Sequence, residues 1–499
     1  MSGKFKKYAK WIVMVIVLGY LVLLIPDRKP AVSSLTQIES KKQPFVWNQD
    51  AYWESMEARY RELRKTGCEK TAPVIQSTIA RLSALLRTLE GKKLNPEAKV
   101  FDEIERQMFE AGSLVGACGT HLREYVKAMT DLRTIIKRQS EHWDMNSAAS
   151  RITLYRLLYG ARAAVEEIIL QVPPHGAPPA LVIALDEGSQ TPSVNIKGVT
   201  LHSGDILVSR GGASTSALIA RGNDFPGNFS HIALFYVDPN THQPKTVEAH
   251  IESGVTVSSF DEYLRGKKLR IMVLRLRSDL PQLIQDPMLP HRAAEMAFKN
   301  AMEKHIPYDF EMNYKDPSKL FCSEVASSVY AAHGVKLWIG ISHISSAGLR
   351  RWLAAFGVKY FETQEPSDLE YDPQLRVIAE WRDLEILRKD HFDNTVTDVM
   401  VEGAEKGDEL SYDWYLLPIA RVAKAYSVLL NLFGKVGIVP EGMSATTGLR
   451  GAFYERQHER IHRQLALKAE QFKAQHGYEP PYWQLVRLAR LAKKEVEGR

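Results

Sequence analysis

Cysteine is scarce in this 499-residue chain, which has only Cys68, Cys118 and Cys322. No two of these form a Cys-x-x-Cys pair, and the glycines at residues 210–214 lack the lysine of a phosphate-binding loop. These absences argue against a cysteine-rich zinc site and against a nucleotide-binding loop. We therefore expect neither a metal nor a cofactor.

The chain also lacks a positive charge spread over its whole length. The formal net charge is +6, but residues 1–29 alone hold six Lys or Arg and one Asp. The remainder is close to neutral, apart from residues 421–499, which have fourteen Lys or Arg against seven Glu. Without a basic surface or a recognition motif, we expect no nucleic-acid partner.

The N-terminus combines a basic cluster with an apolar run. Lys4, Lys6, Lys7 and Lys10 precede residues 11–26, which carry no charge. This pattern predicts a cytoplasmic basic tail and one transmembrane signal anchor in the inner (cytoplasmic) membrane. The catalytic region would then face the periplasm. The alternative is a cleaved signal peptide, with small residues at 31–33 as the cleavage site.

The rest of the chain divides by its periodicity. Apolar residues at three- and four-residue spacing, as in residues 75–89, predict an antiparallel helical bundle, which acts as structural support or as a spacer or partner-binding module. A Pro-rich linker follows, and then short strands that suit an antiparallel sheet. The predicted divisions are 1–29 (tail and anchor), 30–172 (bundle), 173–199 (linker), 200–375 (hydrolase domain) and 376–499 (basic, helical C-terminal region).

Within these divisions, individual elements are predicted from local pattern. The stretch 416–439 is apolar with a few basic residues, and either lies at a membrane interface or packs on the hydrolase domain. Strands are expected at 206–209, 232–237, 246–251 and 269–276, and helices at 148–170, 290–304, from 322, 380–390 and 416–433.

Cys322 is the most informative residue. It follows a loop and opens a predicted helix in which Val325 and Val329 recur on one face. The first turn of a helix has free backbone N–H groups and the positive end of the dipole, so a thiolate is stabilised there. His231 opens a predicted strand and could serve as the base.

The order of these segments resembles that of the permuted papain-like hydrolases, which are NlpC-type enzymes of the YiiX/YebB-like group and distant relatives of lecithin:retinol acyltransferase. The resemblance covers about residues 200–337, with a weaker echo at 366–373. It implies an α+β fold in which a Cys-bearing helix packs on an antiparallel sheet, with flanking helical regions. In that family the histidine precedes the cysteine, as it does here.

The residue that orients His231 is not decided by spacing alone. Side chains at 248, 250 and 252 share one face of the next strand, so Glu248, His250 and Glu252 are all possible. The resemblance favours Glu248, and His250 remains an alternative. It also matches Tyr308 and Asp205 to family positions, as supporting residues.

Together these features predict a membrane-anchored periplasmic cysteine hydrolase that cleaves an amide or ester through an acyl-enzyme. Its substrate would be a cell-wall peptide or a lipid or other acyl compound. The alternative is a non-catalytic scaffold for a cell-envelope partner. In an exported chain, Cys68 and Cys118 could form a disulfide, or all three thiols could be free.

Overall fold

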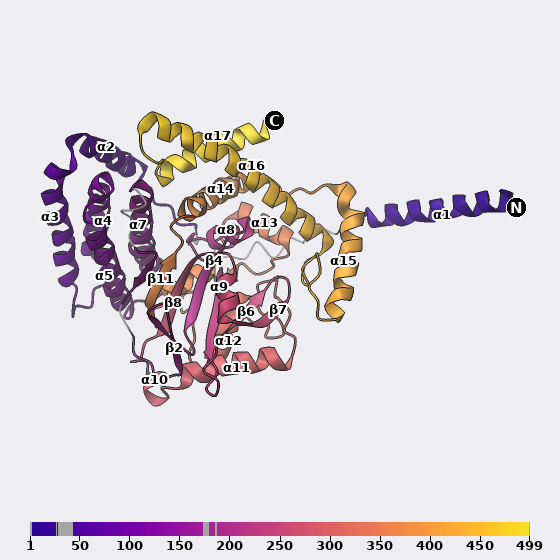
Figure 1. Cartoon of the computed structure of the whole chain (residues 1–499), viewed down its shortest axis with the longest axis horizontal. Coiled ribbons are helices and arrows are strands. Elements are labelled where there is room, and N and C mark those ends of the chain that lie inside the picture. Colours follow the sequence, from indigo (N-terminus) through magenta and orange to yellow (C-terminus); the bar gives the residue numbers. More distant parts are fainter. Residues whose placement is uncertain (1, 26, 28–42, 173–178, 185–186, 499) are drawn as a thin grey trace.

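The computed structural model describes residues 2–25, 27, 43–172, 179–184 and 187–498 (Figure 1). A helical bundle lies beside a central sheet, a group of C-terminal helices contacts both the sheet and the bundle, and helix α1 (Ser2–Leu23) projects from the body. The expected mixture of helices with an antiparallel sheet is confirmed. Within the predicted linker, 173–199, residues 173–178 and 185–186 lie outside the described residues.

The main sheet has seven strands, and each neighbouring pair is antiparallel. Strands predicted near 206, 232, 246 and 269 form its centre. In sheet order the strands are β1 (Leu181–Ile183), β11 (Leu375–Arg382), β8 (Lys268–Leu276), β4 (Ile206–Gly211), β5 (His231–Val237), β6 (Pro244–His250) and β7 (Gly254–Ser259).

One predicted helix is wrong. Residues 380–382, expected to begin a helix over 380–390, form the end of β11, and the next helix, α14 (Leu387–Glu405), begins later. Nearly every residue of β11 is buried, so its side chains show no clear alternation. Periodicity alone does not separate such a strand from a buried helix, and pairing with β8 decides between them.

The two faces of the sheet are covered differently. Helices α11 (Leu289–Glu303) and α12 (Cys322–Ala332) pack on the face that includes Ile232 and Leu234. The opposite face, with Phe235, is covered by the ribbon of β2 (Ser193–Ile196) and β3 (Val199–His202) and by α9 (Phe260–Arg265). The packing of α12 on the first face holds the N-terminal end of this helix, where Cys322 lies, against the sheet.

The N-terminal bundle has its own apolar core. Cys68 opens α3 and Cys118 closes α4, with the Cys68 Sγ 3.8 Å from the Cys118 carbonyl oxygen. Both are free thiols in this structure, and burial with the neighbouring Cys68 raises the pKa of Cys118 to about 12. The helices are α2 (Asp50–Thr66), α3 (Cys68–Arg87), α4 (Lys99–Cys118), α5 (Leu122–Ser140), α6 (Ala148–Leu154) and α7 (Gly160–Gln171), with a π-helical turn η2 (Tyr155–Tyr159) inside the helix expected over 148–170.

Buried ion pairs join the bundle to the sheet. Arg162 of α7 pairs with Glu380 of β11 at 3.1 Å and with Glu370 of the short helix η4 (Pro366–Tyr371). Arg133 of α5 also contacts Glu380, at 2.7 Å. All four side chains are almost fully buried, so the bundle and the sheet share one interior.

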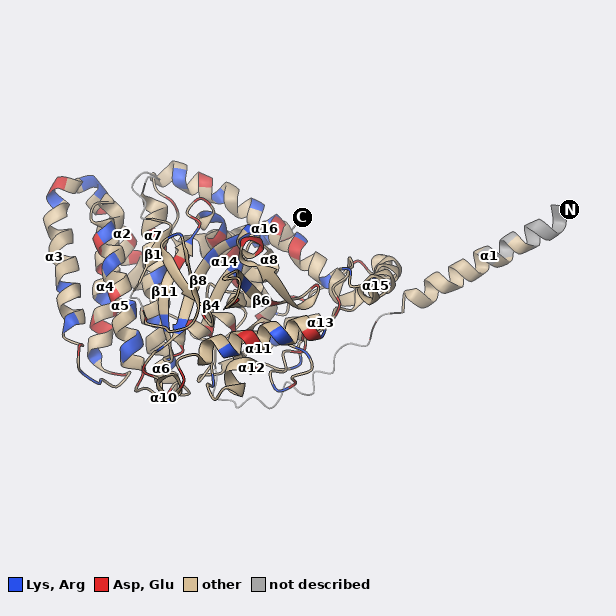
Figure 2. Ribbon diagram, turned by 60° about the horizontal axis from the view of Figure 1, so that its bottom comes forward, with Lys and Arg blue, Asp and Glu red and all other residues tan. Residues whose placement is uncertain are grey.

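The C-terminal helices form a further apolar core with α8 (Ser214–Arg221) and α13 (Ala347–Phe356). α14, α16 (Ala445–His476) and α17 (Tyr482–Glu497) supply most of it. Helix α15 (Leu417–Leu432) packs on α16 but leaves many apolar side chains exposed. Figure 2 shows few charges on α15, whereas α16 carries both signs.

The predicted transmembrane anchor is not supported by the structure. Within the described ranges, no helix combines the length and the apolar character that crossing a membrane requires. The lysines at 4, 6, 7 and 10 fall inside α1 and shorten the uncharged part of that helix. The C-terminal end of α1 lies beside α15, where Arg421 donates to the Leu23 carbonyl at 2.9 Å.

Candidate active site

The thiol of Cys322 lies at the first residue of α12, as expected. Its side chain is 6 % exposed, and it follows an extended residue, Phe321. Two residues upstream, Leu320 bridges to Tyr308, which holds the approach to the helix in an extended conformation. Because the first N–H groups of a helix have no partner within it, the Cys322 backbone N–H is available to an oxyanion near the thiol.

His231 and Glu248 are brought together by the pairing of β5 with β6. Ala233 faces Glu248 in the register, so Glu248 is diagonal to His231 across the two strands. The His231 Nε2 lies 2.9 Å from Glu248 Oε2, and Thr246 donates to the other carboxylate oxygen at 3.1 Å. The carboxylate is therefore fixed on both sides, and it holds the imidazole by one ring nitrogen.

The imidazole also interacts with the thiol. Burial of the ring opposes its protonation, but hydrogen bonds to Cys322 and Glu248 outweigh that effect and raise the pKa of His231 to about 9. Burial likewise works to raise the pKa of Glu248, and the hydrogen bond and charge of His231 leave it lowered. At neutral pH the site thus favours a protonated imidazole beside an ionised carboxylate, which is the charge state that stabilises a thiolate.

His250 occupies a different position from Glu248. Its ring stacks on that of His231, with centroids 5.4 Å apart, and its Nε2 is 3.8 Å from Glu248 Oε2. Burial lowers the pKa of His250, so this ring tends to remain neutral. Between the two alternatives for the orienting residue, the geometry places Glu248 within hydrogen-bond distance of the base.

The two supporting residues lie apart from each other. Tyr308 is close to the thiol, and burial followed by the charges of Cys322 and Asp309 raises its pKa well above the usual value. Asp205 precedes β4 at the end of the sheet away from His231, where it pairs with Arg275 through two contacts of 2.8 Å. Asp205 is thus placed to hold the sheet rather than to touch the thiol.

Two buried carboxyl groups near the thiol were not expected to be neutral. Glu324 accepts a hydrogen bond from the Phe321 N–H at 2.9 Å, and burial raises the pKa of Glu324 to about 9. Glu365 is also buried, and burial, then Asp368 and Cys322, raise its pKa well above the usual value. Glu365 directly precedes the 366–373 segment, which was the only signal for it in the sequence.

The site also contains a group of possible metal ligands. One ligand atom from each of His231, Glu248 and His250 lies within 4.8 Å of the others, so the three could hold a divalent ion such as zinc. No short motif reveals this cluster, because its members come from two paired strands. The expectation of no metal therefore requires an experimental test.

The sequence also contains one zinc-protease motif that the expectation of no metal did not consider: residues 458–462 read His-Glu-x-x-His. In α16, His458 contacts the Asp393 carbonyl at 3.2 Å, and burial lowers its pKa to about 4. The Glu459 side chain is 70 % exposed and lies beside Arg463. The carboxylate that would act as base in a zinc protease therefore points away from the histidines.

Comparison with known families agrees with the geometry. Residues 200–379 match the family model of the permuted papain-like amidase enzymes, the YaeF/YiiX or C92 family. No curated protein and no solved structure matches the chain. The matched segment runs from β3 into β11 and contains Cys322, His231 and Glu248. The resemblance to permuted papain-like hydrolases is confirmed over this segment, and the match supports a cysteine hydrolase.

Proposed function

We propose that this chain, with its segment of the permuted papain-like amidase family, hydrolyses an amide through an acyl-enzyme on Cys322. The observation that carries the proposal is the chain of contacts from Glu248 through His231 to Cys322 at the start of α12. A thiolate nucleophile, a base and an orienting carboxylate are the parts that such chemistry needs.

The reaction follows from the placement of these groups. The Cys322 thiolate attacks the carbonyl carbon, and the developing oxyanion accepts the backbone N–H of Cys322. His231 gives its proton to the leaving nitrogen, so an amine departs and a thioester remains. His231 then takes a proton from water, which attacks the thioester and releases the acid and the thiolate. Glu248 holds the ring for both proton transfers.

The test uses two substrate classes, cell-wall peptides and acyl-lipid amides. Release of amine would be followed for the wild type, Cys322→Ser and the control Cys118→Ser. We expect Cys322→Ser to lose turnover with its fold intact, and Cys118→Ser to retain it. Mass mapping of quenched reactions should find an acyl group on the peptide with Cys322. Full turnover by Cys322→Ser would refute the thiol mechanism.

We propose further that the enzyme works at a membrane surface. Support comes from α15 and the residue that follows it, where several apolar side chains are exposed, including Leu432 at 78 % and Phe433 at 74 %. Exposed apolar surface of this kind on a helix with basic residues fits the interface of a bilayer. Helix α1 adjoins the same region, because Arg421 contacts both Leu23 and Asp27.

Flotation with vesicles containing anionic lipid tests this association. The double variant Leu432→Glu with Phe433→Glu should remain in the protein fraction. The control Leu467→Glu changes an equally apolar, exposed residue of α16 and should float like the wild type. If the double variant floats as well as the control, α15 is not the membrane contact.

The side of the membrane is part of the same proposal. The lysines at 4, 6, 7 and 10 before the apolar run favour a cytoplasmic N-terminus and a periplasmic body. An alkaline phosphatase fused after Lys29 should then be active. An inactive phosphatase fusion with an active fluorescent fusion at the same position would place the body in the cytoplasm.

A further inference from the structure

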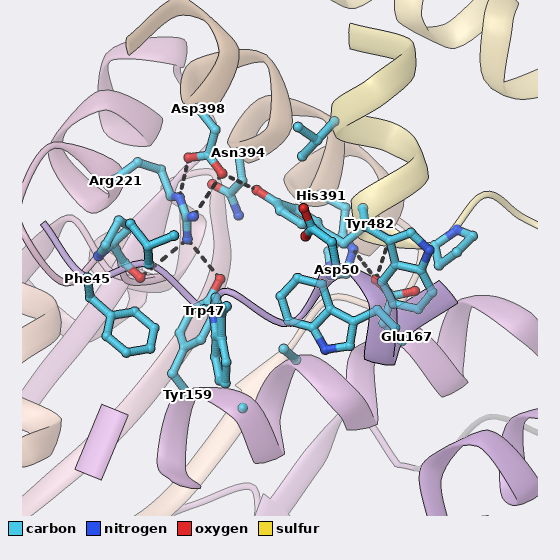
Figure 3. Close-up of a pocket in the computed structure, with 18 of the residues that line it drawn as sticks. Phe45, Trp47, Asp50, Tyr159, Glu167, Arg221, His391, Asn394, Asp398 and Tyr482 are labelled. Carbon is cyan, nitrogen blue, oxygen red and sulfur yellow. Dashed lines mark hydrogen bonds and ion pairs between the residues drawn. The ribbon is translucent and has the colours of Figure 1, made fainter. Parts of the chain in front are cut away.

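A cavity of about 930 Å³ lies between the helical bundle and the C-terminal helices (Figure 3). Residues 43–50, α2, α4, α7, α14 and α17 contribute to its wall, and the described residues that line it do not include Cys322, His231 or Glu248. We propose that this cavity binds an organic amine, a ligand with a protonated amino group and an apolar body. The cavity is large enough for a ligand of drug size.

The wall is rich in aromatic rings. Ten Phe, Tyr or Trp residues line it among those the structure describes, whereas these types make up only 9 % of the chain. Trp53 is central, with its ring 5.7 Å from that of Trp47 and 5.9 Å from that of Trp483. All three rings are only partly buried. Ring faces carry partial negative charge, so such a wall attracts an alkylammonium group and packs against an apolar body.

A buried carboxylate adds a fixed negative charge. Glu57 accepts hydrogen bonds from Tyr478 at 2.6 Å, Trp483 at 2.8 Å and Gln484 at 2.9 Å. Despite burial, these neutral donors leave the pKa of Glu57 lowered. The charge of Arg61 adds to this effect, but no ion pair to Glu57 occurs within the described part of the chain, so the groups in contact with the carboxylate are neutral.

The arginines of the wall are already paired with carboxylates. Arg221 contacts Asp398 at 2.8 and 2.9 Å, with Tyr482 donating to the same carboxylate. Arg490 contacts Glu402 at 2.6 Å, and Arg487 pairs with Glu54. The lining contains no other Arg or Lys among the residues described. His391 also lies on the wall, and it faces Glu166 at 3.2 Å and Glu167 at 3.9 Å. An anionic ligand would therefore have to break an ion pair, whereas a cation would meet Glu57, whose direct contacts are neutral donors.

Two buried acceptors on the wall, Asn394 and Glu167, mark where the amino group would bind. Asn394 is 2 % exposed, lies on the cavity wall in Figure 3, and its Oδ1 has no hydrogen-bond partner in the described structure. Glu167, also on the wall, accepts from the Tyr482 N–H at 2.9 Å and has His391 Nδ1 at 3.9 Å, and burial raises the pKa of Glu167. An unsatisfied buried acceptor costs free energy, which an N–H donor from the ligand would recover.

Three compounds with one body test the charge preference: 4-phenylbutylamine, 4-phenylbutanol and 4-phenylbutyrate. Binding is measured by calorimetry and by tryptophan fluorescence, which Trp47, Trp53 and Trp483 would report. Cys322→Ser protein is used throughout, so the result does not depend on the proposed hydrolysis. The amine should bind about tenfold or more tightly than the alcohol and the acid.

Two variants locate the site. Glu57→Gln should weaken the amine about tenfold. Glu167→Gln should weaken it about threefold, because burial disfavours the charged form of Glu167. Both variants should leave binding of the alcohol unchanged. Gln at 167 can still accept from the Tyr482 N–H, so this variant should fold if Glu57→Gln does not. The matched control, Glu110→Gln, removes a carboxylate of α4 that pairs with Arg106 outside the wall. Equal binding of the three compounds, no binding at millimolar concentration, or an equal loss in the control would overturn the proposal.

Discussion

His250 stacks on His231 with an interplanar angle of 24°, yet the carboxylate that holds His231 belongs to Glu248. The β5–β6 register puts 233 opposite 248, and its continuation puts 231 opposite 250. The direct cross-strand neighbour of the base is therefore a ring contact, and the diagonal neighbour is its hydrogen-bond partner. Substitutions at the two positions should have different consequences.

Glu248→Gln should lower kcat/KM on the order of a hundredfold, because the imidazole loses the carboxylate that orients it and stabilises its protonated form. His250→Gln should have a much smaller effect. The pKa of His231, about 9, sets the upper limit of activity, because the imidazole loses its proton above that pH. In Glu248→Gln this limit should move to lower pH. Profiles of kcat/KM against pH measure both effects, and the reverse ranking would give the orienting role to His250.

Zinc should inhibit the enzyme by about tenfold or more, because it would occupy the ligands needed for proton transfer. Chelation with EDTA should leave the turnover of the purified enzyme unchanged or higher. His250→Gln should relieve the inhibition, since it removes one of the three ligands. Titration of activity with zinc checks this prediction. Loss of activity with EDTA that zinc restores would instead indicate a metallohydrolase.

Glu324→Gln should stabilise the protein at pH 8 by at least about 1 kcal/mol and have little effect near pH 4. Burial raises the pKa of Glu324 to about 9, so between about pH 4.5 and 9 the unfolded chain releases a proton that the folded chain keeps. The wild type therefore loses stability as pH rises through this range. Gln removes that dependence and retains the acceptor for the Phe321 N–H. Urea unfolding at several pH values measures the free energy of unfolding of both proteins. The same dependence of this free energy on pH in both would contradict the assignment.

Arg162→Met should destabilise the protein by about 3–5 kcal/mol, because it leaves Glu370 and Glu380 buried with one cation fewer. The control, Arg106→Met, removes an exposed arginine that pairs with Glu103 and Glu110, and should cost less than about 1 kcal/mol. Chemical denaturation gives both values. Similar losses in the two variants would mean that the buried pairs do not carry the interface.

The parts of the site that could be predicted are those with a local signal. The start of a helix at Cys322 and the strand at His231 follow from short patterns, and the four central strands of the sheet appear where expected. Selection of Glu248 over His250 needed the register, which depends on the hairpin between β5 and β6. The ligand cluster at His250 depends on the same hairpin register, and the strand at 380–382 depends on pairing with β8, which is about a hundred residues away. No local pattern contains that information.

The ion pairs at Arg133 and Arg162 bear on how this protein could have been assembled. Glu370 lies inside the segment that matches the amidase family, but the cation it contacts comes from the N-terminal bundle. The amidase segment could not fold in the same way without the bundle, because the buried carboxylate of Glu370 would then lack its counterion. The helices and the amidase segment are therefore expected to be inherited together, with substitutions at 133, 162, 370 and 380 tied to one another.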